Sequence, residues 1–265
     1  MKTPELTLCE LGDAGLPRHE THSPFCMKVH RALRLAGLTY RRRHAAAPDA
    51  HRALNPARQV PVLLVGDEAV WDSTKIVTRV DELSGGALSR GLDARGRAEA
   101  LLWEEMADTA LGGFLVAARW ADDDNWKRTR AAYFAAMPAV LRAVIPERIR
   151  ARVVKGLHAR DVTRPDLGTC WARLETTLDA LEARAPSAGF WLGGDSPTRA
   201  DIGLFSQLHG LRTPLTPVQS ERVERRARLS AYLDRVDAAS SRAVPSTGPA
   251  LESVAAAAVL AATFG

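Results

Sequence analysis

The sequence predicts a small α/β domain over residues 1–86, followed by an all-helical domain over residues 95–240. Strand-like segments occur only in the first third of the chain, and after Gly86 the apolar residues recur at helical spacing alone. The chain has 265 residues, a length at which one hydrophobic core usually gives way to two. Residues 241–265 are expected to form a C-terminal tail.

Alternating strand and helix patterns define the first domain. Leu6–Leu11 alternates apolar and polar residues, and a loop with two glycines follows. Ser23 and Pro24 favour a helix start, and Gly37 lies where this helix would end. The predicted elements are a strand over 6–11, a helix over 24–36, a strand over 38–44, an irregular helix, a hairpin of strands 61–65 and 68–71, and a helix over 73–83. This order is typical of a small α/β domain.

The second domain contains no convincing strand. Gly85, Gly86 and the polar stretch to Arg95 predict a linker. Helices are predicted over residues 101–120, over 127–145 with Pro138 as a kink, over 171–185, and from near residues 198 and 218. The segment 239–249 is rich in Ser, Ala and Pro, so it is expected to be loosely ordered, with a short alanine-rich helix after it.

Composition excludes several classes of protein. Hydrophobic residues make up 46% and charged residues 25%, which is the balance of a globular enzyme. The longest weakly polar run, Val254–Phe264, is shorter than the roughly 20 residues that span a bilayer, so no membrane partner is expected. Met1–Pro4 leads into a strand pattern without the features of a secretory signal. Cys9, Cys26 and Cys170 are an odd number at no metal-like spacing, which predicts a cytoplasmic protein with neither disulfides nor a metal site.

The net charge of +5 rests mostly on arginine, which is spread along the chain with local runs such as Arg41–Arg43 and four arginines within residues 222–228. Nucleic-acid binding requires such charges on one face, together with aromatic side chains that stack on bases. Basic helix faces are usually just solvated. We therefore expect no nucleic-acid partner.

The segment Ser23–Cys26 joins the first strand to the first helix. Serine is a good N-cap and proline suits the first helical position, so the segment is explained in structural terms as a well-made helix start. The functional alternative uses the same geometry, because unpaired N–H groups and the helix dipole stabilise a thiolate placed beside them. Ser23 would then hydrogen-bond a ligand sulfur. Cys26 would either react as a thiol or pack as a small apolar side chain, and we favour packing.

Two further segments carry ligand-binding signals. Asn55–Leu63 is a loop that runs into the first strand of the hairpin, and a cis Val60–Pro61 bond would expose the Val60 main chain as an edge for a peptide-like ligand. Asp72 and Ser73 lie at a helix start, where either is explained as a plain cap. In a functional site, Ser73 and the helix N-terminus would hold an α-carboxylate, and Asp72 would accept from an α-ammonium.

These motifs resemble those of the glutathione transferase superfamily. Ser23–Cys26 is similar to its active-site turn, Gln59–Val62 to its cis-proline element, and Asp72–Ser73 to its acid-serine site for the glutamyl group. Asp195–Asp201 is similar to its structural capping motif, with Thr198 as the cap and Asp201 at the third helical position. The resemblance covers the chain to about residue 240, and four short motifs in this order are far more specific than any one of them.

The resemblance implies a thioredoxin-like first domain that binds glutathione as co-substrate, and a helical-bundle domain that holds a small-molecule electrophile. It also implies a homodimer in which the first domain of one chain packs on the helical domain of the other. The catalytic candidates are Ser23 and Cys26. The glutathione-binding candidates are Phe25, Gln59, Val60, Pro61, Asp72 and Ser73.

Departures from the family pattern leave several points open. The active-site turn begins with Ser23 rather than with the cysteine of thiol-transferase members, which favours thiolate stabilisation over redox chemistry. The preceding loop is longer than usual and carries His19 and His22, which are either exposed or able to approach the sulfur. Arg58 stands where many members have glycine, and Gln59 where many have lysine, so the contact to the glycyl carboxylate is open.

Three functions are compatible with these residues. The first is a glutathione transferase that ionises the glutathione thiol for attack on an apolar electrophile. The second is a glutathione-dependent thiol-disulfide oxidoreductase that uses Cys26. The third is a binding or scaffold protein without turnover, because the segment Arg119–Trp126, and Asp72–Ser73 with Ile76, also resemble the non-detoxifying branch related to metaxins and failed-axon-connections proteins.

Overall fold

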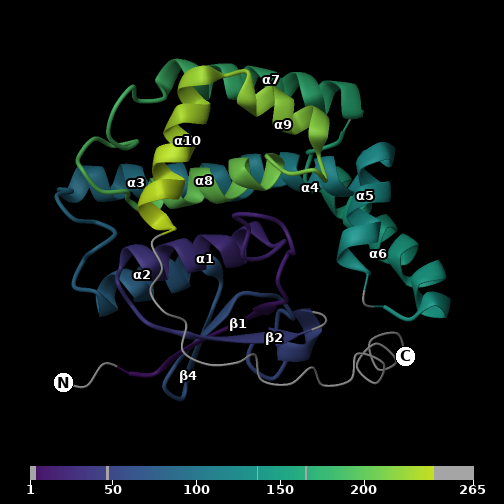
Figure 1. Cartoon of the computed structure of the whole chain (residues 1–265), viewed down its shortest axis with the longest axis horizontal. Helices are drawn as coiled ribbons and strands as arrows, with labels where there is room; N and C mark the ends of the chain where they lie inside the picture. Colours follow the sequence, from purple (N-terminus) through teal and green to yellow (C-terminus); the bar gives the residue numbers. More distant parts are fainter. Residues whose placement is uncertain (1–3, 46–47, 136, 165, 242–265) are drawn as a thin grey trace.

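The computed structural model describes residues 4–45, 48–135, 137–164 and 166–241. It confirms the predicted fold class, with a four-stranded sheet and its helices followed by a helical domain (Figure 1). The sheet has the order β2-β1-β3-β4, in which β1 runs parallel to β2 and β3 runs antiparallel to β1 and β4. The elements of the first domain are β1 (Leu6–Leu11), α1 (Pro24–Leu35), β2 (Arg41–Ala45), the 3-10 helix η1 (Pro48–His51), β3 (Val62–Val65), β4 (Glu68–Trp71) and α2 (Ser73–Leu83).

The pairing of the strands determines which chain ends meet. Cys9 near the end of β1 lies opposite Val62 at the start of β3, and Val62 also lies opposite Trp71 at the end of β4. The loop into α1, the residues before β3 and the start of α2 therefore all leave the sheet at one edge. This meeting of the three segments follows from the topology: β1 and β2 are parallel and joined by a helix, and the β3–β4 hairpin follows them.

Helix α1 packs between the sheet and the helical domain (Figure 1). Ser23 caps its N-terminus, Pro24 occupies the first turn, and Gly37 ends the turn after the helix with a φ of 66°. Val29 and Leu33 enter the core of the first domain, whereas Met27 enters the core of the helical domain. One helix thus belongs to both cores, which ties the two domains together.

The second domain is a bundle around α8, which is buried along its whole length. Figure 1 shows α8 between α1 below it and the outer helices α7 and α9 above it. Thr198 and Asp201 form the predicted capping box at its start. The helices are α3 (Ala94–Met106), a π-helical turn η2 (Ala107–Leu111), α4 (Gly112–Trp120), α5 (Asp123–Tyr133), α6 (Ala139–Ala159), α7 (Leu167–Arg184), α8 (Arg199–Leu211), α9 (Pro217–Glu224) and α10 (Ala227–Ser240).

The helix predicted over residues 127–145 with a kink at Pro138 is wrong. Helix α5 ends at Tyr133, and Pro138 is the N-cap residue of the separate helix α6. Proline lacks an N–H donor and disfavours helical backbone in the residue before it, so it separates the two helices. Helix α6 instead tolerates Pro146 in its third turn, where the missing donor costs a hydrogen bond.

Other helix boundaries also differ from the prediction. Helix α3 starts at Ala94, because Asp93 caps it through a hydrogen bond from the N–H of Gly96. The helix predicted over residues 171–185 starts at Leu167 under an Asp166 cap. Where one helix was predicted from near residue 218, the structure has α9 and α10, separated at Arg225–Arg226. In both cases an aspartate cap sets the start of the helix ahead of the apolar stripe from which it was predicted.

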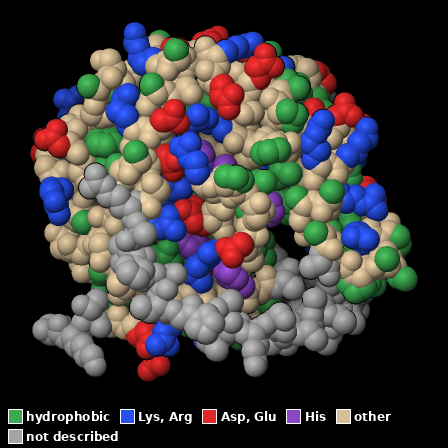
Figure 2. Space-filling view, viewed as in Figure 1, with side chains coloured by type: hydrophobic (Ala, Val, Ile, Leu, Met, Phe, Trp, Pro, Cys, Tyr) green, Lys and Arg blue, Asp and Glu red, His purple; other side chains and the backbone are tan. Residues whose placement is uncertain are grey.

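The helices α5 and α6 form an arm that packs on α4 and projects beside the first domain (Figure 1). Figure 2 shows a hollow between this arm and the body of the molecule. An aromatic cluster attaches the arm to α4: Trp120 contacts Trp126, Tyr133 and Phe134. The arm therefore forms one wall of this hollow.

Several arginines of the two arginine-rich runs form ion pairs within the molecule. Arg42 forms ion pairs with Glu10 and Asp13, and the buried Arg226 pairs with Glu175 and Asp179. Figure 2 shows basic and acidic side chains interspersed on the displayed face. Within the described ranges, no helix is long and apolar enough to cross a membrane. The predicted tail lies outside the described residues apart from Ser241, and Ala239 and Ser240 belong to α10.

Candidate functional site

The three ligand-binding motifs gather at the edge of the sheet where β1 and β4 end and β3 begins. Ser23 lies at the N-terminus of α1, Val60–Pro61 directly before β3, and Asp72–Ser73 at the N-terminus of α2. Two helix N-termini and one strand edge therefore face the same region. This combination of positive dipole ends and main-chain hydrogen-bonding groups suits an anionic, peptide-like ligand.

Ser23 is half-buried in extended backbone conformation, with φ −81° and ψ 119°. Its Oγ accepts a hydrogen bond from the N–H of Cys26 at 3.3 Å, which is the predicted capping interaction. The Ser23 side chain lowers the pKa of the Cys26 thiol, although burial raises it more strongly. The oxygen of the Ser23 hydroxyl thus caps the helix, and its O–H hydrogen can donate to a ligand.

Cys26 is fully buried, with an exposed fraction of 0%. Burial raises the pKa of its thiol far above the ordinary range, and the charge of Glu10 raises it further. A neutral thiol without access to solvent is neither a nucleophile nor a target for disulfide exchange. The environment of Cys26 thus agrees with the packing role and opposes the redox mechanism.

The Val60–Pro61 peptide bond is cis, as the motif requires. The pairing of β3 with β1 stops at Val62, so Val60 lies beyond it, half-exposed. Within the described part of the chain, no hydrogen bond uses the Val60 N–H or C=O. Gln59 is exposed beside it. A main chain that is free at such an edge can pair with the backbone of a peptide ligand.

Asn55 shapes this turn, a role that was not predicted from the sequence. Its side chain is buried; Nδ2 donates to the carbonyl of Gln59 at 2.9 Å, and Oδ1 accepts from the N–H of Ala57 at 2.9 Å. Asparagine before proline is a turn signal, so the sequence offered a hint at this position. Asn55 holds the loop closed behind Val60.

Asp72 is the N-cap of α2 and has a φ of 77°, a conformation that costs free energy in any residue other than glycine. Its Oδ1 accepts from the N–H groups of Thr74 at 3.0 Å and Lys75 at 3.1 Å. Oδ2 takes part in no hydrogen bond among the described residues. The predicted capping role is thus present, and one carboxylate oxygen is left for a ligand. Ser73 follows, buried, at the first position of the helix.

A buried ion cluster supports the start of α2 from behind. Lys28 of α1 is fully buried and donates to Glu104 at 2.8 Å, and it also pairs with Asp108 on the π-helical turn. Its ammonium reaches Thr74, the neighbour of Ser73, at 3.3 Å. The members of this cluster are separated by up to 80 residues in the sequence. Their spacing along the chain therefore did not predict that they would meet. The cluster ties α2 to both α1 and the helical domain.

The loop before Ser23 is attached to the helical domain. His19 stacks on His209 of α8 with ring centroids 4.1 Å apart, and its Nε2 bonds to the His209 carbonyl at 3.1 Å. Arg18 pairs with Asp237 of α10. Burial lowers the pKa of His19, and it lowers that of His209 to about 3. The prediction that loop histidines are merely exposed is therefore wrong for His19.

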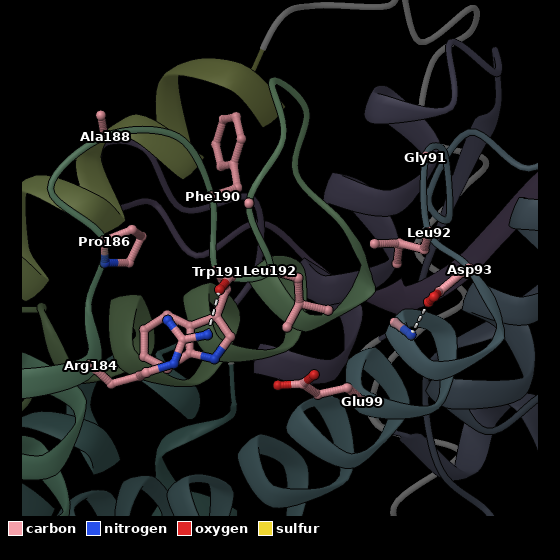
Figure 3. Close-up of a pocket in the computed structure, with 12 residues that line it drawn as sticks. Gly91, Leu92, Asp93, Glu99, Arg184, Pro186, Ala188, Phe190, Trp191 and Leu192 are labelled. Atoms are coloured by element: carbon pink, nitrogen blue, oxygen red, sulfur yellow. Dashed lines mark hydrogen bonds between the residues drawn. The ribbon is translucent and has the colours of Figure 1, made fainter.

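A cavity of about 650 Å³ lies elsewhere, between the start of α3, the end of α7 and the loop at residues 186–193 (Figure 3). Arg184 lies over the ring of Trp191 at 4.9 Å, and Trp191 packs edge-on against Trp103. None of the predicted site residues lines this cavity. It is a hollow within the helical domain that is separate from the motif residues.

Comparison with known families and structures agrees with this geometry. Residues 24–125 match the glutathione S-transferase N-terminal domain, and residues 131–235 match the glutathione S-transferase C-terminal domain. No curated protein sequence matches the chain. With both domains matched in order and the fold in agreement, the chain belongs to the glutathione transferase superfamily.

Solved structures show the same fold at low sequence identity. The apo form of glutathione S-transferase III is 19% identical with a TM-score of 0.56, covering 92% of this chain and 99% of its own. A Pseudomonas fluorescens family member with two glutathione molecules bound is 15% identical, with a TM-score of 0.56 and 88% coverage of both chains. The beta-etherase LigF from Sphingobium is 18% identical, with a TM-score of 0.56, covering 88% of this chain and 95% of its own.

Proposed function

We propose that this protein is a glutathione transferase that binds glutathione at the sheet edge and stabilises its thiolate through Ser23. One observation carries the proposal: the half-buried hydroxyl of Ser23 caps the N-terminus of α1, at the same end of the sheet as the cis Val60–Pro61 turn and the start of α2. The oxygen of this hydroxyl accepts from the N–H of Cys26, so its hydrogen can donate to a bound thiolate, which accepts strongly.

The reaction follows from this arrangement. Bound glutathione releases its thiol proton to solvent, and the thiolate attacks the electrophilic carbon. A sulfur–carbon bond forms while the leaving group departs with its bonding electrons. Lowering a thiol pKa from about 8.5 to about 6.5 requires ~2.7 kcal/mol. One hydroxyl hydrogen bond and a helix dipole are together of that size.

The rest of glutathione would occupy the other two motifs. The free N–H and C=O of Val60 would pair with the cysteinyl main chain, and Ser73 with the α2 N-terminus would hold the γ-glutamyl carboxylate. Oδ2 of Asp72 would accept from the glutamyl ammonium. We assign Phe25, Pro61 and the exposed Gln59 to the surrounding contacts. Burial of all three cysteines as free thiols is consistent with the cytoplasmic location that we propose.

Two assays on the wild-type protein test this function. Conjugation of glutathione to an aryl halide should proceed, and glutathione-dependent reduction of a small disulfide should be negligible in comparison, because Cys26 is inaccessible. Disulfide reduction without conjugation would reverse the assignment in favour of the oxidoreductase. Glutathione binding with neither activity would favour a binding or scaffold protein.

We further propose a homodimer. Helix α3 exposes Leu101 and Leu102, the latter with 69% of its surface accessible, and burying such side chains stabilises association. Light scattering should therefore give about twice the chain mass of 28.7 kDa. A monomer of 28.7 kDa at assay concentrations would argue against the dimer and would weaken the enzyme assignment.

A further inference from the structure

Arg119 of α4 is a buried arginine next to the active-site turn. Only 3% of its surface is exposed. Its Nη1 donates to the carbonyl of His22 at 2.6 Å, and its Nη2 donates to the carbonyl of Gly210 at 2.7 Å. His22 is the residue directly before Ser23. One guanidinium group therefore joins the turn to the C-terminal end of α8.

Tyr133 at the end of α5 completes this contact. Its hydroxyl accepts from Nη1 of Arg119 at 2.8 Å and donates to the His22 carbonyl at 3.3 Å. Its ring stacks on the His22 imidazole with centroids 4.6 Å apart. The main chain and the side chain of His22 are thus both held by the arm of α5 and α6. In the sequence, the segment Arg119–Trp126 was singled out only for its resemblance to the metaxin-related branch. No role for Arg119 or Tyr133 at the active-site turn was therefore predicted.

Charge balance makes the contact unusual. Within the described ranges, no carboxylate forms an ion pair with Arg119, and its hydrogen-bond partners are two carbonyl groups and one hydroxyl. Burying a guanidinium without a counter-ion is costly. The C-terminal end of α8 offsets part of the cost, because Gly210 lies in its last turn, where the dipole is negative. Burial and the nearby positive charge of Arg119 lower the pKa of His22 to about 4, so His22 stays neutral at physiological pH.

Glycine at position 210 makes room for the contact. A Cβ atom there would lie 2.7 Å from a methyl carbon of Leu115 and 3.4 Å from Nη2 of Arg119. A side chain at this position would therefore displace the end of the Leu115 side chain and crowd Nη2 of Arg119, the atom that donates to the Gly210 carbonyl.

We propose that Arg119, held by Tyr133, is a positioning residue for Ser23: it fixes the His22 carbonyl and so keeps the Ser23 hydroxyl aimed at the glutathione sulfur. This inference rests on the proposed function. Neither residue touches the reacting atoms in this account. They reduce the number of conformations open to the turn. The Ser23 hydroxyl is therefore already oriented toward the sulfur before the reaction begins.

Tyr133→Phe tests the proposal, because it removes the hydroxyl and keeps the ring that stacks on His22. We expect kcat for conjugation to fall about fivefold, the effect of losing one hydrogen bond, while the Kd for glutathione changes less than twofold. Arg119→Lys keeps the charge but loses the two-pronged contact, so kcat should fall about tenfold or more. If Arg119→Lys does not fold, Tyr133→Phe still decides the question.

Tyr232→Phe is the matched control. The Tyr232 hydroxyl is also buried in the helical domain and donates to Asp201 at 2.8 Å in the capping box of α8. Its loss should lower the melting temperature and leave kcat within about twofold of wild type. Equal falls in kcat for Tyr133→Phe and Tyr232→Phe would mean a general loss of stability and would overturn the positioning role.

Hydrogen–deuterium exchange gives a readout that needs no activity. In the ligand-free protein, Tyr133→Phe should increase exchange of the peptide spanning residues 18–26 about fivefold, and Tyr232→Phe should not. Unchanged exchange would overturn the inference whether or not the protein conjugates glutathione. Faster exchange with unchanged kcat would overturn it as well, because the contact would then not serve Ser23. A wild-type protein without conjugation would reject the proposed function alone, while exchange would still decide whether Tyr133 holds the turn.

Discussion

Ser23→Ala is expected to lower the rate of conjugation by one to two orders of magnitude. The substitution removes the hydroxyl that caps the N-terminus of α1, the end of the helix at which the bound thiolate would lie. A charge-assisted hydrogen bond to the thiolate is worth roughly 1.4 to 2.7 kcal/mol, which corresponds to this range. The rate constant should be measured with an aryl halide at saturating glutathione.

Cys26→Ala is the paired substitution. Because Cys26 is fully buried and its thiol is held neutral, its removal should leave conjugation nearly intact and cost only packing stability. The opposite pattern, with activity lost in Cys26→Ala and retained in Ser23→Ala, would replace the transferase mechanism by the redox mechanism. If neither substitution changes the rate, the activity is misassigned and the non-catalytic description becomes the better one.

Ser73→Ala should weaken glutathione binding about tenfold, the ~1.4 kcal/mol expected for a lost hydrogen bond to a carboxylate. Ser73 is buried at the start of α2, next to the helix N-terminus that we assign to the glutamyl carboxylate. Isothermal titration calorimetry measures the change. Ser84→Ala at the C-cap of the same helix is the matched control and should leave the affinity unchanged. Unchanged affinity in Ser73→Ala would remove the glutamyl assignment.

Much of the first domain was predictable from local sequence. The strand pattern of Leu6–Leu11, the Ser23–Pro24 helix start and the hairpin around Gly66–Asp67 each depend on neighbouring residues only. The capping box at Thr198 and Asp201 was equally local. Because the strand pairing then determines which loops meet, the three motifs at the sheet edge followed from the order of the elements.

The rest of the candidate site depends on contacts that no local pattern encodes. Lys28, Asp108 and Thr74 lie on three different elements, and Arg119 reaches His22 across 97 positions of the chain. The break before Pro138 was misread, because the apolar residues on both sides also fit one kinked helix. Because one helix was predicted where the structure has α5 and α6, the sequence did not predict the arm that they form. It also did not predict that Tyr133 lies beside the active-site turn.

The ionisation of bound glutathione tests the central claim most directly. The ultraviolet absorbance of the thiolate should be followed against pH with saturating glutathione, in the wild-type protein and in Ser23→Ala. We predict that the bound thiol of the wild type ionises about two units below the free value of about 8.5, and that Ser23→Ala raises this pKa by about one unit or more. A bound thiol that ionises at the free value, or one whose pKa is the same in both proteins, would contradict the account.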